Sequence, residues 1–404
     1  MFSNRDEAIT YIHQRPKAGK KDSFERMQAL LAALGHPENQ IPDAIHITGT
    51  NGKGSVATMV TAMAVASGLK VGSFTSPYMI DFAERFKINR QNIDDQSLIA
   101  YTNLVATAVS EVEGQSANQL QPTEFEVVTA IMLAFFAHAD LDLAVIEVGI
   151  GGQYDSTNVL TTTKVAVVTT VALDHQAMLG GTIEAIAKQK AGIIKAGAVT
   201  VVGPNLPKSA FQVIQERAQR VQSPLIISQS TKLHSRMTGT YQVDNTATAV
   251  SVIRAWHPDL AVEDLQKGLD QAFLPGRFEK IKPGFYLDGA HNAAGIKALH
   301  QTIQNDLKGP VTVIIGTLAE KNVNQALREL ANDWQIRLVL VPFVGPNGRI
   351  SLQNDQVELP SHEYTWFDSF DQAESAITEN ETVVVTGSLY FISDVRRKLC
   401  KKKS

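Results

Sequence analysis

Short apolar runs and amphipathic segments alternate along the first two thirds of the chain. A short apolar run between glycines or polar residues is typical of a buried strand, and apolar residues at helical spacing are typical of a helix. The apolar runs predict strands at 45–48, 70–77, 143–149, 165–171, 198–202 and 225–228. Helical spacing predicts helices at 4–14, 23–34, 56–67, 94–112, 124–138, 182–191, 245–256 and 262–273. This alternation favours a doubly wound α/β domain.

Two segments lack a clear period. Residues 78–89 mix aromatic and charged side chains, so we expect a loop there that carries function. Residues 113–122 are polar and are expected to form a connecting loop.

A second series of strands and helices follows the sequence Leu274-Pro275-Gly276-Arg277, where Pro and Gly indicate a domain boundary. Its strands are predicted near 284–288, 311–316, 337–342 and 382–387, and its helices near 293–307, 322–333, 369–378 and 389–399. We therefore expect an N-terminal domain over 1–275 with a P-loop-type, mostly parallel sheet, a linker over 276–282, and a smaller Rossmann-like α/β domain over 283–404. The loop 343–361 is long, polar and undefined by its pattern.

The composition of the chain excludes several classes of partner and site. A net charge of −4 over 404 residues provides no basic field for nucleic acid. The single cysteine, Cys400, excludes an internal disulfide and a cysteine-based metal site. The first residues do not form a signal peptide, and the apolar runs are too short to cross a bilayer. We expect a soluble cytoplasmic protein without a membrane or nucleic-acid partner.

A glycine-rich loop follows the first apolar run, with the sequence Gly49-Thr50-Asn51-Gly52-Lys53-Gly54-Ser55. Glycines let backbone amides approach an anion, and the N-terminus of the next helix favours negative charge. Lys53 can then reach the β- and γ-phosphates, and Ser55 offers a hydroxyl to Mg²⁺. The loop departs from the standard P-loop pattern, because Ile47 replaces the first glycine and Gly54 separates Lys53 from Ser55. A glycine-rich turn without a ligand is therefore the alternative.

Two further polar residues lie at predicted strand ends, where open α/β sheets bind ligands. Glu147 lies within the apolar run 143–149, where a carboxylate is costly unless it is paired or binds a metal. We favour a metal, because the glycine loop predicts a nucleotide; an ion-paired glutamate is the alternative. His175 ends the strand region after 165–171 and is either a ligand or an ordinary polar residue.

Several motifs occur in a fixed order over nearly the whole chain, and together they resemble the folylpolyglutamate synthase family of the Mur ligase superfamily. Their joint order is far more specific than any one of them. The motifs are TGTNGKGS (48–55), TSP (75–77), EVGIGG (147–152), DSTNV (155–159), LDH (173–175), KAGIIK (190–195), PGR (275–277), DGAHN (288–292) and TGSLY (386–390).

The resemblance implies an ATP-dependent ligase whose folate carboxylate attacks the γ-phosphate of ATP. The resulting acyl phosphate reacts with L-glutamate to form a γ-linked amide, with release of ADP and phosphate. The N-terminal domain would be the ATPase domain and the C-terminal domain the glutamate-ligase domain. The family also implies a monomer that acts on a folate polyglutamate.

The resemblance further implies specific roles for residues of the N-terminal domain. Lys53 and the other residues of 49–55 would bind ATP. Two Mg²⁺ ions would be held by Ser55, Ser76, Glu147, His175 and Lys190. Lys190 matches a family lysine that CO₂ converts to a carbamate, which requires an amine with a lowered pKa; an ordinary helix lysine is the alternative, and Lys188 is close by. The folate site would comprise Ser76, Pro77, Tyr78, Phe82, Arg85, Gln153 and Asp155.

Later motifs add the remaining site residues. The resemblance places Gln242 and Asn245 beside the adenine and Arg277 and Asp288 on ATP, and it makes His291 a catalytic residue, with Asn292 beside it.

Two departures from the family pattern bear on the substrate and on the DGAHN motif. Gln153 stands where many relatives have Arg, and Ala293 stands where many have Pro. The loop of Gln153 lies near the pterin in relatives that also act on dihydropteroate. Gln153 at this position argues against a dihydrofolate synthase activity without excluding it. A dihydrofolate synthase or bifunctional enzyme is kept as the alternative, a P-loop NTPase switch is an alternative of another class, and a non-catalytic folate-binding relative is a further one.

Overall fold

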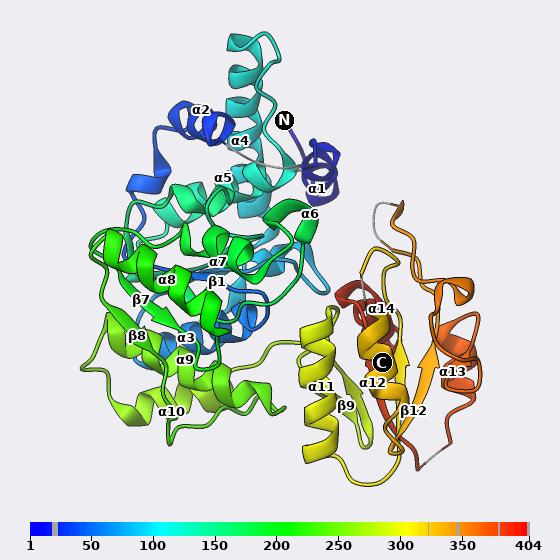
Figure 1. Ribbon diagram of the computed structural model, residues 1–404. Coiled ribbons are helices and arrows are strands. Elements are labelled where there is room, and N and C mark those ends of the chain that lie inside the picture. The colour runs from blue at the N-terminus through cyan, green and yellow to red at the C-terminus, as the bar shows by residue number, and fades with distance from the viewer. Residues whose placement is uncertain (18–22, 322, 346–347, 379, 402–404) are drawn as a thin grey trace. The chain divides into compact units, whose positions relative to one another are not determined.

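The computed structural model describes all residues except 18–22, 322, 346–347, 379 and 402–404. Its chain divides into two compact units, one of residues 1–236 and 244–272 and the other of residues 237–243 and 273–404 (Figure 1). Helix α9 (Tyr241–Trp256) carries residues of both.

The first unit is built on an eight-stranded sheet in the order β4-β3-β2-β5-β1-β6-β7-β8. All neighbours from β2 to β8 pair in parallel, while β3 and β4 pair antiparallel. The mostly parallel, doubly wound α/β fold predicted from the sequence is thus confirmed. The strands are β1 Ala44–Thr48, β2 Val71–Phe74, β3 Phe86–Ile88, β4 Gln91–Asn92, β5 Leu143–Glu147, β6 Thr163–Val168, β7 Val199–Val202 and β8 Leu225–Ile227.

Helices surround this sheet, and short 3₁₀ turns connect several of its strands. The helices are α1 Arg5–Gln14, α2 Glu25–Ala33, α3 Lys53–Ala66, α4 Asp95–Gln115, α5 Glu124–Ala137, α6 Gln176–Leu179, α7 Ile183–Ala191, α8 Lys208–Arg220, α9 and α10 Val262–Gln271. The 3₁₀ turns are η1 Pro37–Asn39, η2 Phe82–Arg85 and η3 Ser156–Val159.

Several parts of the first unit differ from the sequence prediction, and neither the two-residue β4 nor the four-residue α6 was predicted. The prediction of a loop over 78–89 is wrong for the second half of that segment. Turn η2 and strand β3 lie there, and Phe86 pairs with Phe74 of β2. Helix α8 was not predicted. Its buried stripe consists of Ala210, Ile214 and Ala218, which are too few and too small to show a clear helical period.

The core lies on both faces of the sheet. On one face α4 and α5 enclose a cluster that includes Phe74, Phe86 and Phe136. Helix α3 lies on the opposite face and packs closely on α10. A Cβ at Gly268 of α10 would lie only 2.5 Å from the Cα of Met63 in α3. This close approach of two helices explains the glycine.

Replacing Gly268 by alanine should lower the free energy of unfolding by about 1–3 kcal/mol, because the new methyl group meets backbone rather than a movable side chain. The shift of the urea midpoint measures this loss. The matched control is Gly114→Ala in α4, where no atom lies within 4 Å of the new Cβ and where alanine should stabilise the helix by up to about 1 kcal/mol. Equal stabilities of the two variants would contradict the packing argument.

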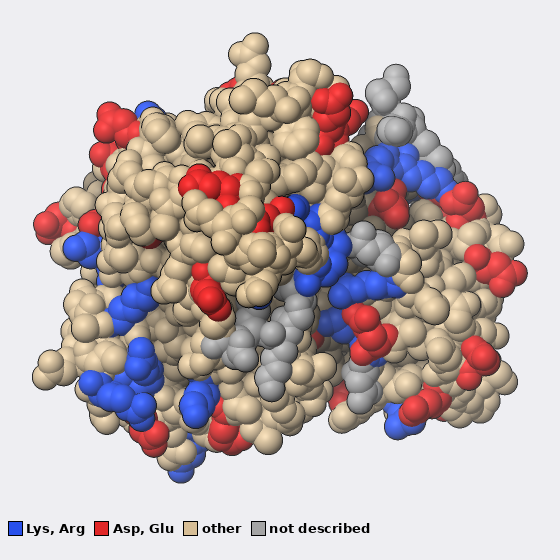
Figure 2. Space-filling view, turned by 90° about the horizontal axis from the view of Figure 1, so that it is seen from above, with Lys and Arg blue, Asp and Glu red and all other residues tan. Residues whose placement is uncertain are grey.

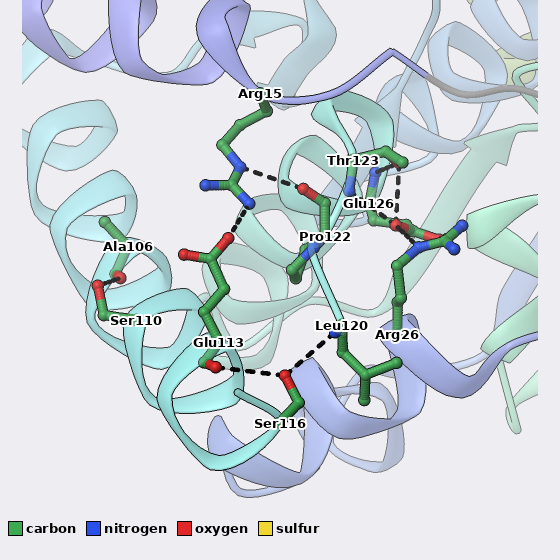
Figure 3. Close-up of polar contacts among 10 residues, drawn as sticks. All are labelled: Arg15, Arg26, Ala106, Ser110, Glu113, Ser116, Leu120, Pro122, Thr123 and Glu126. Carbon is green, nitrogen blue, oxygen red and sulfur yellow. Dashed lines mark hydrogen bonds and ion pairs between the residues drawn. The ribbon is translucent and has the colours of Figure 1, made fainter. Parts of the chain in front are cut away.

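Ion pairs and hydrogen bonds tie the N-terminal segment to the end of α4 and the start of α5 (Figure 3). Arg15 pairs with Glu113 and donates to the carbonyl of Pro122, and Arg26 pairs with Glu126 at 3.1 Å. Glu126 also completes a capping box with Thr123. The segment before α5 is therefore fixed from several sides.

The second unit has a six-stranded sheet in the order β13-β12-β11-β14-β10-β9, in which only β9 pairs antiparallel. This confirms the predicted second α/β domain. Strand β9 lies within the segment 276–282 that was expected to be a linker, and neither β9 nor the two-residue β13 was predicted. The elements are β9 Glu279–Lys282, β10 Phe285–Leu287, α11 Ala293–Asp306, β11 Val311–Ile315, α12 Asn324–Ala331, β12 Ile336–Leu340, η5 Asn354–Gln356, β13 Thr365–Trp366, α13 Phe370–Ser375, β14 Thr382–Thr386 and α14 Leu389–Lys401.

Acidic and basic side chains are interspersed on the face shown in Figure 2. None of the helices in the described part of the chain is both long and apolar enough to span a membrane.

Candidate active site

The glycine loop connects the central strand β1 to α3, as the sequence predicts. The Lys53 side chain folds back over this loop, and its Nζ donates to the carbonyl oxygens of Gly49 at 2.9 Å and Thr50 at 3.3 Å. Ser55 is buried in the first turn of α3. A flexible cation, a serine hydroxyl and a helix N-terminus thus occupy one end of the sheet, which suits a triphosphate.

The segment after β6 fixes the conformation of this loop. Thr169 Oγ1 donates to the carbonyl of Asn51 at 2.6 Å, and the Asn51 amide donates to Thr170 Oγ1 at 2.9 Å. A Cβ at Gly49 would lie 1.9 Å from Thr169 Oγ1, so only glycine fits there. Contacts from Thr169 and Thr170 therefore help to hold this loop in shape.

Helix α9 brings Asn245 against the same loop. Gly52 has a φ of +88°, and a Cβ there would lie 2.4 Å from Asn245 Oδ1. Both Gln242 and Asn245 are buried in the first turns of α9, which begins four residues before the predicted start at 245. The structure thus places Asn245 beside the glycine loop.

Glu147 and Ser76 meet at the carboxyl ends of the neighbouring strands β5 and β2. The Ser76 amide donates to Glu147 Oε2 at 3.2 Å, and Arg85 donates to Ser76 Oγ at 2.8 Å. Glu147 is 5% exposed. A buried carboxylate beside a hydroxyl at this edge of the sheet is a suitable pair of oxygen ligands for Mg²⁺.

Replacing Glu147 by glutamine should lower kcat by about a hundredfold or more, because the charge is lost while the amide oxygen still accepts from Ser76. Rates of phosphate release at saturating magnesium measure the effect, and the melting temperature should change little. Glu216→Gln on the exposed face of α8 is the matched control. A rate close to wild type for Glu147→Gln would remove the metal assignment.

Arg85 lies between the serine and two aromatic rings. It is buried, and its guanidinium lies 5.1 Å from the ring centre of Tyr78 and 5.5 Å from that of Phe82. The Ser76–Pro77 peptide bond is cis. The predicted folate residues of this segment therefore form one cluster of a cation and two rings.

His175 is the N-cap of α6 and has a φ of +49°, a conformation that non-glycine residues adopt mainly where the surrounding structure enforces it. Its Nε2 lies 4.0 Å from Asp174 Oδ2, and the Asp174 side chain is 8% exposed. The buried Asp174 carboxylate was not predicted as a site residue.

Lys190 is buried at the end of α7, whereas Lys188 is exposed on the same helix. Burial lowers the pKa of the Lys190 amine well below its usual value, and the positive charge of Lys53 lowers it further. The carboxylates of Asp174 and Asp155 act on this pKa in the opposite direction. Lys190 thus interacts with two predicted site residues, Lys53 and Asp155, and with Asp174, and burial favours the neutral form of its amine.

The loop after β5 carries Gln153 and Asp155. Asp155 uses both carboxylate oxygens within the loop, since Oδ2 accepts from the Ile150 amide at 3.0 Å and Oδ1 from the Thr157 amide at 3.0 Å. The backbone amide of Gln153 donates to the backbone carbonyl of Gln189 in α7. The structure gives Asp155 a role in shaping this loop that the sequence did not predict.

Phe125 lies against the loop after β5, although no sequence motif pointed to it. Its ring packs against the backbone of Gly149, where a Cβ would lie 2.6 Å from Cζ. Gly149 follows the end of β5, and a glycine at such a place indicates that another group comes close to the backbone. The sequence does not indicate that this group is the ring of Phe125.

In the second unit, Asp288 follows β10 and accepts three hydrogen bonds, from the hydroxyl of Tyr241 and from the amides of Phe278 and Ala290. Burial and the negative charge of Asp288 raise the pKa of Tyr241 well above its usual value. A Cβ at Gly289 would lie 2.9 Å from Nη1 of Arg277, so Arg277 lies against this turn.

The same turn carries the other predicted residues of the second unit. His291 Nδ1 lies 2.9 Å from the carbonyl oxygen of Gly289, and Asn292 caps α11 by accepting from the amide of Gly295 at 2.8 Å. The DGAHN motif is therefore a strand–helix turn, as predicted.

Among the residues that the structure describes, no group of three or more His, Cys, Asp or Glu is placed to hold a metal ion. The predicted metal set relies on two serines and a modified lysine in addition to Glu147 and His175. Its assignment therefore stays a prediction.

Two family models match the chain in order: the Mur ligase middle domain over residues 47–203, and the Mur ligase glutamate ligase domain over residues 276–389. Folylpolyglutamate synthase from Lacticaseibacillus casei is 36% identical over 99% of this chain and 100% of its own length. Dihydrofolate synthase/folylpolyglutamate synthase from Bacillus subtilis is 34% identical over 99% and 100%. A solved FPGS–AMPPCP–folate complex matches with a TM-score of 0.86 at 35% identity, over 98% of this chain and 99% of that one.

The two α/β units and these matches define a Mur ligase, a class of ATP-dependent ligases. Within that class the chain belongs to the folylpolyglutamate synthase family. The resemblance described from the sequence motifs is thereby confirmed.

Proposed function

We propose that this chain uses ATP to add L-glutamate in γ-linkage to a tetrahydrofolate polyglutamate, with release of ADP and phosphate. The folate carboxylate attacks the γ-phosphate, the acyl phosphate forms as ADP leaves, and the glutamate amine then displaces phosphate. The observation that carries this proposal is the cluster of Lys53, Glu147, Ser76 and buried Lys190 at the carboxyl edge of one sheet. The FPGS complex with AMPPCP and folate supports the same pair of substrates.

Within this reaction the glycine loop binds and orients the triphosphate. Lys53 leaves the loop carbonyls that it contacts and pairs with the terminal phosphates, which places a positive charge where negative charge develops. Arg85 and the rings of Tyr78 and Phe82 provide a cation and flat apolar surfaces for the folate.

The donor atoms at this edge fit magnesium. Ser55, Ser76, Glu147 and His175 would hold it with Lys190 in carbamylated form, and Glu147 beside Ser76 provides the oxygen donors that the ion prefers. When bound, magnesium offsets the charge on the transferring phosphoryl group.

Lys190 would form its carbamate when the lone pair of the neutral amine attacks the carbon of CO₂ and the nitrogen loses one proton. The new N–C bond converts a buried cation-forming group into an anion. That anion would lie near Lys53, whose charge now disfavours a protonated Lys190. The lowered pKa of Lys190 supports this proposal.

Two findings on relatives favour a second substrate, dihydropteroate. The Bacillus subtilis relative is named for both activities, and a solved structure of E. coli FolC contains DHPP and ADP, at 26% identity and a TM-score of 0.86. Gln153, in the loop fixed against α7, is the residue on which this alternative depends.

Phosphate release with ATP, magnesium and glutamate tests the proposal, with tetrahydrofolate mono- and polyglutamates compared with dihydropteroate. Turnover on folates alone establishes glutamate addition to folate, and turnover on both establishes a bifunctional enzyme. ATP hydrolysis that needs neither glutamate nor folate would instead indicate a nucleotide switch. A monomeric state and a cytoplasmic location are further predictions, which light scattering and fractionation test.

A further inference from the structure

A buried histidine lies beneath the active-site loop. His46 is in the middle of β1, its side chain is 0% exposed, and its sheet neighbours are Ile146 and Ala166. Its Nε2 lies 2.8 Å from Thr157 Oγ1 in η3. An imidazole in the central strand of a sheet is costly unless its polar atoms are used, so the contact with Thr157 is the feature to explain.

The direction of the hydrogen bonds follows from the groups involved. Thr157 Oγ1 lies 2.6 Å from Asp155 Oδ1, and an ionised carboxylate can only accept, so the single hydroxyl proton of Thr157 points to Asp155. His46 must therefore donate from Nε2. Its Nδ1 has no hydrogen-bond partner among the residues that the structure describes. Burial and the nearby Lys195 lower the pKa of His46 well below its usual value, in agreement with a neutral ring.

Asp155, at the end of this chain of hydrogen bonds, shapes the active-site loop. Its Oδ2 accepts from the backbone amide of Ile150, three residues after Glu147 at the end of β5. Its charge also acts on the amine of Lys190. The conformation of Asp155 therefore affects both the loop of Gln153 and the electrostatics of Lys190.

We propose that His46 is a positioning residue, which through the Thr157 hydroxyl fixes the Asp155 carboxylate and with it the folate-side loop 149–155. Strand β1 thus serves two parts of the site: its end leads into the glycine loop, and its buried face supports the opposite loop. Thr48, two residues on and on the same face, adds to this by donating from Oγ1 to the carbonyl of Gly151. The inference rests on the proposed folate ligase function for its kinetic test only.

The Thr157 hydroxyl can be removed without changing the volume of the side chain. Thr157→Val should lower kcat/KM for the folate about tenfold, as expected for one lost buried hydrogen bond, while Thr157→Ser should stay within about twofold of wild type. The KM for ATP should change less than twofold in both. Equal folate kcat/KM values for the valine and serine variants would overturn the proposal.

A double-mutant cycle separates positioning from packing. His46→Leu should also lower kcat/KM for the folate about tenfold. The double variant His46→Leu/Thr157→Val should lower it by no more than about tenfold, since both changes break the same chain of hydrogen bonds. A cost near one hundredfold in the double variant would show independent roles and overturn the proposal. If His46→Leu fails to fold, the valine and serine pair still decides.

Nitrogen NMR of the histidine rings gives a readout that does not need activity. The wild-type protein should show His46 as the neutral tautomer protonated at Nε2, and Thr157→Val should shift the Nε2 signal. A ring protonated at Nδ1 would overturn the proposal. An inactive wild-type protein with the expected NMR signals would instead contradict the proposed function and leave this inference supported.

Discussion

Lys53→Ala is expected to lower kcat for folate-dependent phosphate release by about a thousandfold or more. Lys53 is the cation that folds over the glycine loop, with Nζ at 2.9 Å from the carbonyl of Gly49, and alanine leaves the terminal phosphates without it. Steady-state rates and nucleotide binding by calorimetry measure the loss. The loop itself should persist, because Thr169 and Thr170 hold Asn51 from the other side.

The matched control is Lys208→Ala, which removes an exposed lysine at the start of α8. It should leave both kcat and the affinity for ATP unchanged. If Lys53→Ala kept a rate within about threefold of wild type, the glycine loop would not be the triphosphate site.

Lys190→Ala is expected to reduce kcat by about a hundredfold or more, with partial recovery when acetate or another small carboxylate is added. The variant removes the amine that would carry the carbamate, and a small anion can occupy the space of the lost carboxylate group. Burial holds the pKa of this amine well below its usual value, so the neutral form needed to attack CO₂ is favoured. Rates with increasing acetate, at constant ionic strength, measure the recovery.

Lys188→Ala provides the control, because Lys188 is exposed on the same helix two residues earlier. It should be fully active and insensitive to acetate. Lys190→Ala with an undiminished rate would remove the carbamate from the mechanism, and a slow variant without rescue by any small carboxylate would indicate that the amine itself is required.

The sequence predicted the sheet of the first unit because its strands are continuous apolar runs. Strand β5 is buried at every position from Leu143 to Glu147, and such a pattern is hard to mistake. Strand β3 was missed because Lys87 and Ile88 are only partly buried and the segment has no alternation to detect. Helix α8 was missed for a related reason, since its buried face consists mainly of alanine.

The candidate site was predicted where a motif ends a strand, and was missed where a contact joins distant segments. Glu147 and Lys53 stand out in the sequence as a carboxylate in an apolar run and a lysine among glycines. The links of Thr169 to the glycine loop and of His46 to Thr157 join residues more than one hundred positions apart, and no local pattern announces them. Lys190 was selected through the family resemblance, and only the structure separates it from Lys188 by burial.

The hydrogen bonds between the glycine loop and residues 169–172 have a consequence for synthesis of the chain on the ribosome. Both strands next to β1 are also distant in sequence, since β5 begins at Leu143 and β6 at Thr163. Because the ribosome adds about 5–20 residues per second, residues 169–172 are made several seconds after the loop 49–55 that they hold in shape. Until then β1 has neither of its neighbouring strands, so the nascent chain exposes an apolar strand that chaperones can bind. The glycine loop also lacks the contacts that shape it for a nucleotide.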